Sequence, residues 1–325
     1  MSKTKLKLHD KREYYKPFQY PWAYDAWLAS EQSHWIHTEV ALNEDIKDWQ
    51  NKLSESEKYF LTQIFRFFTQ GDICVSEGYV EKYLPIFPQP EVRMMLMSFA
   101  AREAIHIAAY SHLIETIGMP ESTYKEFYEY KEMVEKHEFF STIKDEVKEK
   151  DTALQIATFS AFTEGVQLFS SFVMLLNFQR HGLMKGMGQV IVWSILDETM
   201  HCDNMIKLFR TYIEENKNIW KDDLKSKIYT IAEKIVELED NFIDLSFNMG
   251  PMQNLTADDV KQYIRYICDR RLISLGLKGI FKVKKNPLPW VEEMLNVKSH
   301  VNFFENFSTD YNKGTLSGTW GDVWK

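Results

Sequence analysis

Apolar side chains recur at helical spacing over most of the chain. The clearest run begins at Tyr59-Phe60 and continues through Ile64-Phe65 and Phe67-Phe68 towards Tyr83. Runs of the same kind cover residues 91–117, 151–180, 187–215, 221–247 and 257–277. A repeat near 3.6 residues predicts helices, and no segment shows the strict alternation that is typical of a strand. The pattern therefore predicts a protein that is nearly all α-helix.

Helix-breaking residues divide this pattern into hairpins. Ser54-Glu55-Ser56-Glu57 has the composition of a helix start. Phe87-Pro88-Gln89-Pro90 and the segment that opens with His181-Gly182 are clusters that end helices and turn the chain. Gly118-Met119-Pro120 is a further stop signal, after which a shorter helix is expected over residues 121–136. We therefore predict two long antiparallel helix pairs with a shorter helix between them.

Isolated acids interrupt the apolar runs of four predicted helices. Two of them belong to Glu-x-x-His pairs, Glu103-Ala-Ile-His106 and Glu198-Thr-Met-His201, whose members share one helix face. Asp72 precedes the first pair and Glu164 precedes the second. An acid in such surroundings costs free energy unless a cation or hydrogen bonds compensate it. Four carboxylates and two imidazoles are a ligand set for a pair of iron or manganese ions.

The spacing of these acids predicts that they face one another. The two acids of the first helix pair are 31 residues apart, with their midpoint at Phe87-Pro88. Those of the second pair are 34 residues apart, with their midpoint at His181-Gly182. Folding each segment at its turn brings the acids level on neighbouring antiparallel helices. Two such hairpins packed together make a four-helix bundle with six ligands at mid-height.

A single Glu-x-x-His pair is weak evidence, because about one match is expected by chance in an acidic chain of this length. A third match, Glu31-Gln32-Ser33-His34, precedes any strong helical pattern, and we interpret it as incidental. The other two pairs lie symmetrically about two turn signals, with apolar neighbours on all four segments. This symmetry favours a metal site.

Composition argues against several other classes of protein. The formal net charge of −8 argues against a nucleic-acid surface, and the three cysteines show no Cys-x-x-Cys spacing that would indicate a zinc site or a disulfide framework. The longest apolar stretch, residues 153–178, is interrupted by Thr163-Glu164 and Gln167, which argues against a membrane span. The chain begins with polar residues rather than an apolar signal region. We expect a soluble, cytoplasmic protein.

The two ends of the chain differ from the helical body. Residues 1 to about 50 have the composition of an aromatic, irregular arm with short helical pieces. From Ser308 onward the chain has almost no aliphatic residues, which is typical of a flexible segment. Tyr311, Trp320 and Trp324 in this tail suit a peptide that docks in a partner's groove. We predict one helical domain over residues 1–307 and a docking tail over residues 308–325.

These residues resemble those of the small, radical-generating subunit of class I ribonucleotide reductase, over roughly residues 15–312. The resemblance implies a ferritin-like helical bundle with a four-helix dimetal core and extra helices. It also implies how the ligands are shared between two metals: Asp72, Glu103 and His106 at one, and Glu164, Glu198 and His201 at the other.

The same resemblance assigns the stored radical to Tyr110. Helical spacing places Tyr110 on the face of Glu103 and His106, where it would otherwise be an ordinary core aromatic. The family usually keeps the surrounding positions apolar, but Ser194 here either changes the hydrogen bonding and lifetime of the radical or points elsewhere. The positions that match this wall are Leu168, Phe172, Ile191 and Ser194.

Three further matches concern the movement of electrons. Asp197 corresponds to the acid that holds the outer N–H of a ligand imidazole. Trp35 corresponds to the tryptophan at the start of the family's electron-transfer route, although Trp49 lies close by in the sequence and leaves this assignment open. Tyr311 matches the tail tyrosine that relays oxidation across the subunit interface.

The resemblance also implies the cofactor, the activity and the partners. Two reduced metal ions would react with O2 or another oxidant, and the oxidised pair would take an electron and a proton from Tyr110. Iron is the expected metal, while manganese or a mixed pair stays open because both metals accept the same ligands. The chain would form a homodimer and pass the radical to a separate large subunit, bound through the tail, that reduces ribonucleotides to deoxyribonucleotides. No glycine-rich nucleotide-binding motif occurs in this sequence.

Two rival functions would use the same bundle. An O2-activating oxidase or desaturase would need a substrate pocket beside the metals and no conducting tail, so Tyr311 and the tryptophan-bearing terminus weigh against it. An iron-storage protein is usually a much shorter chain and has no use for the aromatic arm. Deleting residues 308–325 separates these functions, because only the reductase subunit should then lose activity while its metal site stays intact.

Overall fold

The computed structural model describes residues 6–141 and 149–295. These residues contain no β-strand, only an isolated bridge between Met252 and Leu255. The chain divides into two compact units, Met1–Pro287 and Leu288–Lys325. All the labelled helices belong to the first unit, and the second begins with a short helical stretch over residues 289–295. The predicted all-α fold is confirmed.

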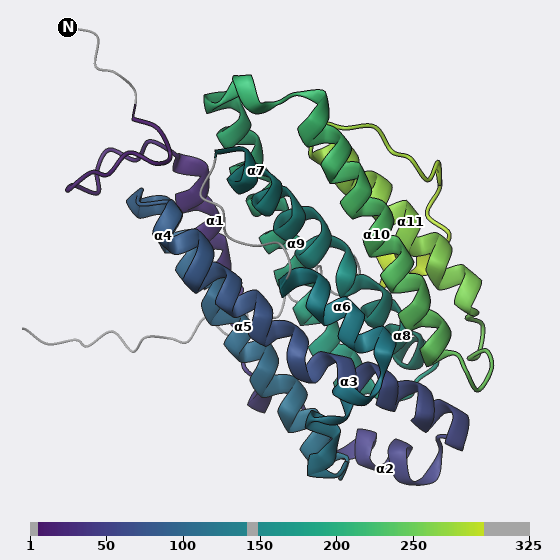
Figure 1. Cartoon of the computed structure of the whole chain (residues 1–325). Helices are drawn as coiled ribbons and strands as arrows, with labels where there is room; N and C mark the ends of the chain where they lie inside the picture. Colours follow the sequence, from purple (N-terminus) through teal and green to yellow (C-terminus); the bar gives the residue numbers. More distant parts are fainter. Residues whose placement is uncertain (1–5, 142–148, 296–325) are drawn as a thin grey trace, which may run out of the picture. The chain divides into compact units, whose positions relative to one another are not determined.

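The first long helix pair consists of α3 (Glu55–Glu77) and α5 (Pro90–Thr116), which pack against each other (Figure 1). Ser54 begins α3 with a capping box, in which its hydroxyl and the Glu57 carboxylate each accept a backbone N–H at the other end. A π-helical segment, η2 (Gly78–Tyr83), and the single turn α4 (Leu84–Ile86) continue α3 into the turn at residues 87–89. The turn therefore lies where the prolines predicted it.

The second long pair is less regular than predicted. The first arm begins as α7 (Glu149–Ala157), changes to a ten-residue π segment, η5 (Thr158–Gln167), and ends as α8 (Phe169–Arg180). The second arm is α9 (Lys185–Glu215), which packs against η5 and α8. Asp151–Arg180 is long and apolar enough to cross a membrane, but its apolar window is completely buried within the protein, as in the core helix of a soluble protein.

The start of α9 is fixed by acids from another helix, α2 (Asn43–Asn51). The backbone N–H groups of Gly186 and Met187 donate to Asp45 at 2.9 and 2.7 Å. Carboxylates at a helix N-terminus accept hydrogen bonds from free N–H groups and interact favourably with the positive end of the helix dipole. A Cβ at Gly186 would lie 2.7 Å from the carbonyl oxygen of Ala41, so this close approach requires glycine. Thus α2 helps to position the helix that carries the second Glu-x-x-His pair.

The remaining helices cover the four-helix core. Figure 1 shows α1 (Pro21–Gln32) beside α5 on one side, and α10 (Asp222–Ser246) and α11 (Ala257–Ser274) on the other side, next to α8. Near the start of the chain, Glu91 in the first turn of α5 accepts from the Arg12 guanidinium and from the backbone N–H groups of residues 19 and 20. The predicted irregular arm is thereby tied to α5.

The predicted helix over residues 121–136 is wrong in its first half. That half forms two short 3-10 turns, η3 (Glu121–Tyr124) and η4 (Glu126–Glu129), and a regular helix begins only with α6 (Lys131–Ser141). Side chains of α3 compete for the backbone here: the Gln70 amide donates to the Tyr124 carbonyl at 3.3 Å. A carbonyl engaged by a neighbouring helix favours a short turn over a continuous helix.

Candidate metal centre

The six predicted ligands meet in the interior of the four-helix core. Asp72 comes from α3, Glu164 from η5, and the two Glu-x-x-His pairs from α5 and α9. Each of the six side chains is at most 1% exposed. Their ligand atoms form two groups, within each of which they lie within 4.8 Å of one another: Asp72, Glu103, His106 and Glu198, and Glu103, Glu164, Glu198 and His201.

Glu103 and Glu198 belong to both groups, so each could be shared by two metal ions. Close contacts cross between α5 and α9: Nδ1 of His106 lies 3.2 Å from Oε1 of Glu198, and Nδ1 of His201 lies 3.1 Å from Oε1 of Glu103. Asp72 and Glu164 each belong to one group only, at opposite ends of the site. Two metal ions held here would each have one imidazole and one carboxylate of their own, and would share the carboxylates of Glu103 and Glu198.

The residues fit a metal pair because their donor atoms lack other partners. Within the described part of the chain, both carboxylate oxygens of Glu103 and Glu198 are buried without a hydrogen-bond donor. The same holds for Oδ2 of Asp72, Oε2 of Glu164, and Nδ1 of both ligand histidines. Buried polar atoms are normally satisfied, and buried charges require a counter-charge. Two divalent cations would satisfy these atoms with oxygen and nitrogen donors that suit iron or manganese.

The electrostatics of the ligand set also call for positive charge. Burial, together with the neighbouring Glu198 carboxylate, raises the pKa of Glu164 to about 8, although His201 opposes the rise. Burial likewise raises the pKa of Asp72 well above its usual value; the Glu103 and Glu198 carboxylates add to the rise and His106 opposes it. Carboxylates that repel one another in a buried site are stabilised when metal ions enter among them.

The π segment that carries Glu164 is held from two sides. Nε of Arg271, on α11, donates to the Gly165 carbonyl at 3.1 Å, and Nζ of Lys136, on α6, donates to the Gln167 carbonyl at 3.1 Å. A π turn disturbs the regular ladder of a helix, so carbonyls within it can accept from side chains. A Cβ at Gly165 would approach Arg271 and Cys202 to 2.8 Å, so glycine is needed for this contact.

Lys136 is itself part of a buried ion pair. Its Nζ lies 2.7 Å from Oε1 of Glu239 on α10, and both side chains are fully buried. Burial lowers the pKa of Lys136, whereas the Glu239 carboxylate raises it. Ser170 also donates to Glu239. The ion pair therefore links α6 and α10 to the helix that carries Glu164, although neither charged residue was singled out in the sequence.

Outside the ligands, the structure brings Asp197, His106 and Trp35 together as the resemblance implied. Oδ2 of Asp197 lies 3.3 Å from Nε2 of His106 and accepts from Nε1 of Trp35 at 2.8 Å. The Trp35 ring stacks on the His106 ring with their centroids 5.8 Å apart. Trp49 instead contacts Phe65, so the geometry favours Trp35 for the position beside Asp197. Trp193, which the sequence analysis missed, lies 5.2 Å from Trp35 between ring centroids and is partly exposed.

Tyr110 lies directly beyond the first metal group. Its ring centroid is 6.3 Å from that of His106, and its hydroxyl donates to Oγ of Ser194 at 2.8 Å. Phe68 stacks on the phenol with the ring centroids 4.6 Å apart. The other expected wall residues, Leu168, Phe172 and Ile191, are all buried. Ser194 therefore points at the phenol rather than away from it.

A second buried tyrosine, Tyr79, contacts the opposite end of the site. Its hydroxyl donates to Oε1 of Glu164 at 2.5 Å, and its ring lies 6.0 Å from that of His201 between centroids. Tyr79 has no local signal in the sequence, because its partner Glu164 lies 85 residues further along the chain.

The third Glu-x-x-His match, the cysteines and the C-terminal tail remain to be placed. Glu31 of the third Glu-x-x-His match accepts from the Ser98 hydroxyl at 2.7 Å and joins neither ligand group. The cysteines at 74, 202 and 268 are free. Tyr311 and the predicted tail over residues 308–325 lie outside the described residues, as does the predicted domain end at residue 307, so these stay predictions.

A four-helix core whose interior holds two groups of carboxylates and imidazoles defines the class of dimetal-carboxylate proteins. Within this class, the family description "Ribonucleotide reductase, small chain" matches residues 12–287. The chain belongs to this family.

Individual relatives agree with the family match. The probable ribonucleoside-diphosphate reductase small subunit 048L of Invertebrate iridescent virus 3 is 54% identical over 332 residues, which cover 97% of this chain and 88% of that protein. The ribonucleoside-diphosphate reductase subunit beta of Chlamydia pneumoniae is 30% identical, with 93% and 90% of the two chains covered.

Solved structures agree on the fold. The ribonucleotide reductase R2 subunit from Clostridium botulinum superimposes with a TM-score of 0.79 at 24% identity, covering 85% of this chain and 88% of that one. The predicted ferritin-like fold and the predicted enzyme, a class I ribonucleoside-diphosphate reductase of which this chain is a small subunit, are confirmed. Neither the oxidase nor the iron-storage alternative finds support in these comparisons.

Proposed function

We propose that this chain generates and stores the radical of a ribonucleoside-diphosphate reductase, with Tyr110 as the carrier. The observation that carries the proposal is the pair of buried ligand groups without other partners, with the Tyr110 ring 6.3 Å from the ring of His106. A phenol this close to the site can deliver an electron to it without an intermediate carrier.

The proposed cofactor is a pair of iron ions. They would be held by Asp72, Glu103, His106, Glu164, Glu198 and His201. Once oxidised by O2, the bound pair supplies the oxidising power needed to take an electron from a phenol. A manganese or a mixed manganese–iron pair suits the same donors. Metal analysis of the protein isolated from its natural source decides between them.

The surroundings of Tyr110 suit a stored radical. Phe68, Phe172, Leu168 and Ile191 keep water and soluble reductants away from the ring. Ser194 accepts from the phenol in the reduced protein, and we propose that its hydroxyl turns to donate to the phenoxyl oxygen after oxidation. A hydroxyl can exchange these roles because it is both a donor and an acceptor.

The route out of the site would run from His106 through Asp197 to Trp35. Hydrogen bonds and ring stacking connect these three side chains without a gap. Trp193 extends the route towards the surface, because its ring contacts Trp35 and is partly exposed. We propose that Tyr311, in a tail over residues 308–325 that docks on the large subunit, carries the oxidation onward to the subunit that reduces the ribonucleotide.

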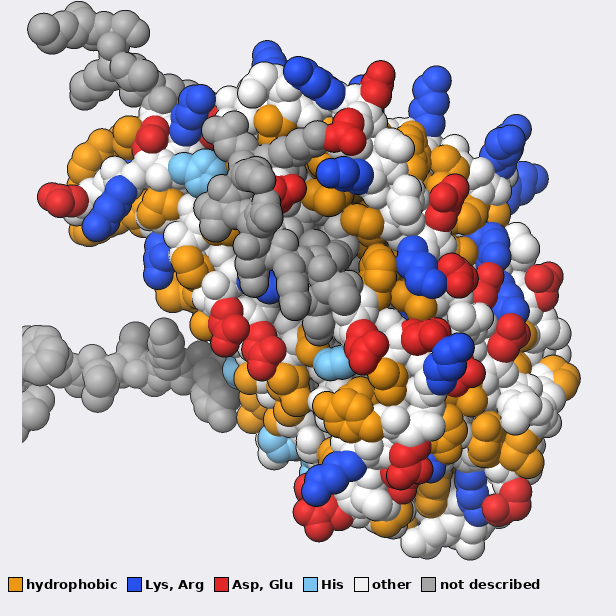
Figure 2. All heavy atoms as spheres, in the orientation of Figure 1, with side chains coloured by type: hydrophobic (Ala, Val, Ile, Leu, Met, Phe, Trp, Pro, Cys, Tyr) orange, Lys and Arg blue, Asp and Glu red, His pale blue; other side chains and the backbone are white. Residues whose placement is uncertain are grey.

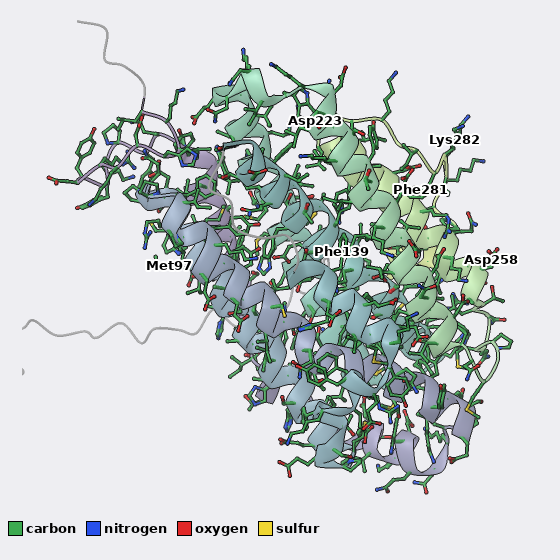
Figure 3. All side chains as sticks on the ribbon, in the orientation of Figure 1. Met97, Phe139, Asp223, Asp258, Phe281 and Lys282 are labelled. Atoms are coloured by element: carbon green, nitrogen blue, oxygen red, sulfur yellow. The ribbon has the colours of Figure 1, made fainter. Side chains whose placement is uncertain are left out.

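A homodimer is the proposed assembly of the small subunit itself. On the neighbouring helices α3 and α5 and on η2, Ile73, Val80 and Met97 are 39%, 50% and 48% exposed, and residues 101 and 104 are exposed alanines. Figure 3 shows Met97 on the outer side of α5. Apolar side chains on adjoining helices, with small residues between them, suit helix packing against a second copy.

We expect neither nucleic acid nor membrane as a partner, and a cytoplasmic location. Among the described residues on the face shown in Figure 2, acidic and basic side chains are interspersed and no basic stripe stands out. A basic stripe would be needed to follow a phosphate backbone.

Reconstitution with the separately purified large subunit tests the proposed function. We expect conversion of a ribonucleoside diphosphate to its deoxy form only when both subunits are present. Deletion of residues 308–325, and Tyr311→Phe in the full chain, should each abolish turnover while metal content and the tyrosyl signal stay unchanged. Turnover that survives the deletion would contradict the tail assignment, and a small subunit that oxidises another substrate alone would favour an oxidase.

A further inference from the structure

The proposed function leaves one phenol at the metal centre without a role. Tyr79 is fully buried, and its hydroxyl donates to Oε1 of Glu164 at 2.5 Å. Oε2 of the same carboxylate has no hydrogen-bond partner among the described residues and faces Nδ1 of His201 at 3.8 Å, so it can bind a metal while Oε1 holds the phenol. Tyr79 is therefore hydrogen-bonded to Glu164, a member of the second ligand group.

Tyr79 and Tyr110 occupy equivalent places at the two ends of the centre. The Tyr110 ring lies 6.3 Å from that of His106, and the Tyr79 ring lies 6.0 Å from that of His201. Apolar rings also surround Tyr79, since Phe159 and Phe99 lie 4.9 and 6.0 Å from it between centroids. Distance and shielding therefore do not distinguish the two phenols as electron donors.

The two phenols differ in what can receive the phenolic proton. A phenol that loses an electron must also release its proton, because the oxidised phenol is a strong acid. Tyr110 donates to Ser194, a neutral hydroxyl and a weak base. Tyr79 donates to a carboxylate, which can accept the proton along the existing hydrogen bond. Protonation of a metal ligand weakens its bond to the metal, so a radical formed in this way should return quickly to the phenol.

The fold holds Tyr79 in this position through two π segments. Tyr79 lies in η2 and Glu164 lies in η5, and the hydrogen bond between them links the two segments. Gly78 allows their close approach, because a Cβ there would lie 2.6 Å from the Phe159 ring. π segments in otherwise regular helices are frequent at functional sites.

We propose that Tyr79 is a second oxidisable tyrosine of the metal centre, which supplies the electron when Tyr110 cannot. The inference rests on the proposed radical function. In the step, the O–H bond of Tyr79 breaks, its electron reduces the oxidised metal pair by one equivalent, and its proton moves to Oε1 of Glu164. A neutral phenoxyl radical remains. O2 is the terminal oxidant, and the ferrous ions and added ascorbate supply its other electrons.

The test uses rapid-freeze electron paramagnetic resonance on the full chain carrying Tyr110→Phe, after Fe(II), ascorbate and O2 are added. We expect a short-lived tyrosyl signal, which is lost when Tyr79→Phe is added. Tyr83→Phe is the matched control, because Tyr83 is a buried tyrosine of the same π segment whose hydroxyl donates to the Gln155 carbonyl. The signal should persist in that control, and iron content is measured in every variant.

A second variant covers the case in which Tyr79→Phe disturbs folding or iron binding. Site-specific replacement of Tyr79 by 3,5-difluorotyrosine in the Tyr110→Phe protein keeps the hydroxyl, and fluorine splitting must then appear in the signal if residue 79 carries the radical. A signal without that splitting, one that survives Tyr79→Phe, or no signal in iron-loaded Tyr110→Phe protein would overturn the inference. If the Tyr79 inference is overturned but the unmodified chain shows a normal Tyr110 signal, the proposed radical function still stands. Absence of any tyrosyl signal in the unmodified, iron-loaded chain would contradict both the Tyr79 inference and the proposed radical function.

Discussion

At the scale of single residues, the six proposed metal ligands are the side chains that this fold would stabilise least without a cofactor. Four carboxylates and two imidazoles are buried together, and most of their donor atoms lack a partner among the described residues. Burying like charges side by side is unfavourable, and bound metal ions make the electrostatic energy of the site favourable. The individual ligands should therefore differ in how many metal ions depend on them.

Asp72 belongs to one ligand group and Glu103 to both. We expect Asp72→Asn to retain about one metal ion per chain, whereas Glu103→Gln should retain fewer. Losing a hydrogen-bond partner of a ligand already lowers metal affinity about 10–100-fold, and losing a ligand should cost at least as much. Glu31→Gln in the incidental Glu-x-x-His match is the control and should bind as the unmodified chain does. Elemental analysis after desalting measures the difference. Equal metal content in the Asp72 and Glu103 variants would contradict the bridging role of Glu103.

Ser194 should tune the radical at Tyr110 through its hydrogen bond to the phenol. Ser194→Ala removes the 2.8 Å hydrogen bond and leaves the buried phenol without an acceptor, at a cost of about 1–3 kcal/mol. We expect high-field electron paramagnetic resonance to show an increased g1 value, because the phenoxyl oxygen loses its donor. Ser171→Ala, at a buried hydroxyl without a partner, is the control and should leave g1 unchanged. An unchanged g1 in Ser194→Ala would mean that Ser194 does not contact the radical.

At the scale of helices, the buried pair of Lys136 and Glu239 supports the π segment that carries Glu164. Lys136→Met should destabilise the chain by about 3–5 kcal/mol, because it leaves a buried carboxylate without its cation. Lys136→Met combined with Glu239→Leu should recover much of that loss. Lys131→Met, in an exposed ion pair with Glu135, is the control and should cost less than about 1 kcal/mol. Denaturant unfolding of metal-free protein measures all three, and equal losses in the single and double variants would contradict the ion-pair account.

Helix positions and turns could be predicted from the sequence because their signals are local. Prolines and glycines end helices through their own backbone preferences, so the turns lie at residues 87–89 and near Gly182, which has a φ of +81°. The meeting of the six proposed ligands could be predicted because helical period and turn position together determine which side chains lie close together.

The π segments could not be predicted in this way. A π turn changes the period by a fraction of a residue, and the apolar composition of residues 158–167 fits either helix type. Contacts from distant helices, such as Lys136 and Arg271 to carbonyls of η5, stabilise it and leave no local signal. Tyr79 and Trp193 were missed for a related reason, because their partners Glu164 and Trp35 are distant in sequence.

At the scale of the whole molecule, the outer faces of α3 and α5 predict self-association. Met97→Asp with Ala101→Asp should convert a dimer to a monomer, because it places charges in an apolar helix interface. Met249→Asp is the control, since Met249 is an exposed methionine that follows α10, and it should leave the mass unchanged. Light scattering after gel filtration measures the mass. A Met97/Ala101 variant that remains dimeric would place the interface elsewhere.

We propose that six buried ligands hold two metal ions that oxidise Tyr110. The most direct measurement adds Fe(II) and O2 to metal-free protein and records iron content together with the electron paramagnetic resonance spectrum. We expect about two irons per chain and a stable tyrosyl signal that is absent from Tyr110→Phe. A stable signal that persists in Tyr110→Phe would contradict the assignment of the radical, and protein that binds no metal would contradict the ligand site itself.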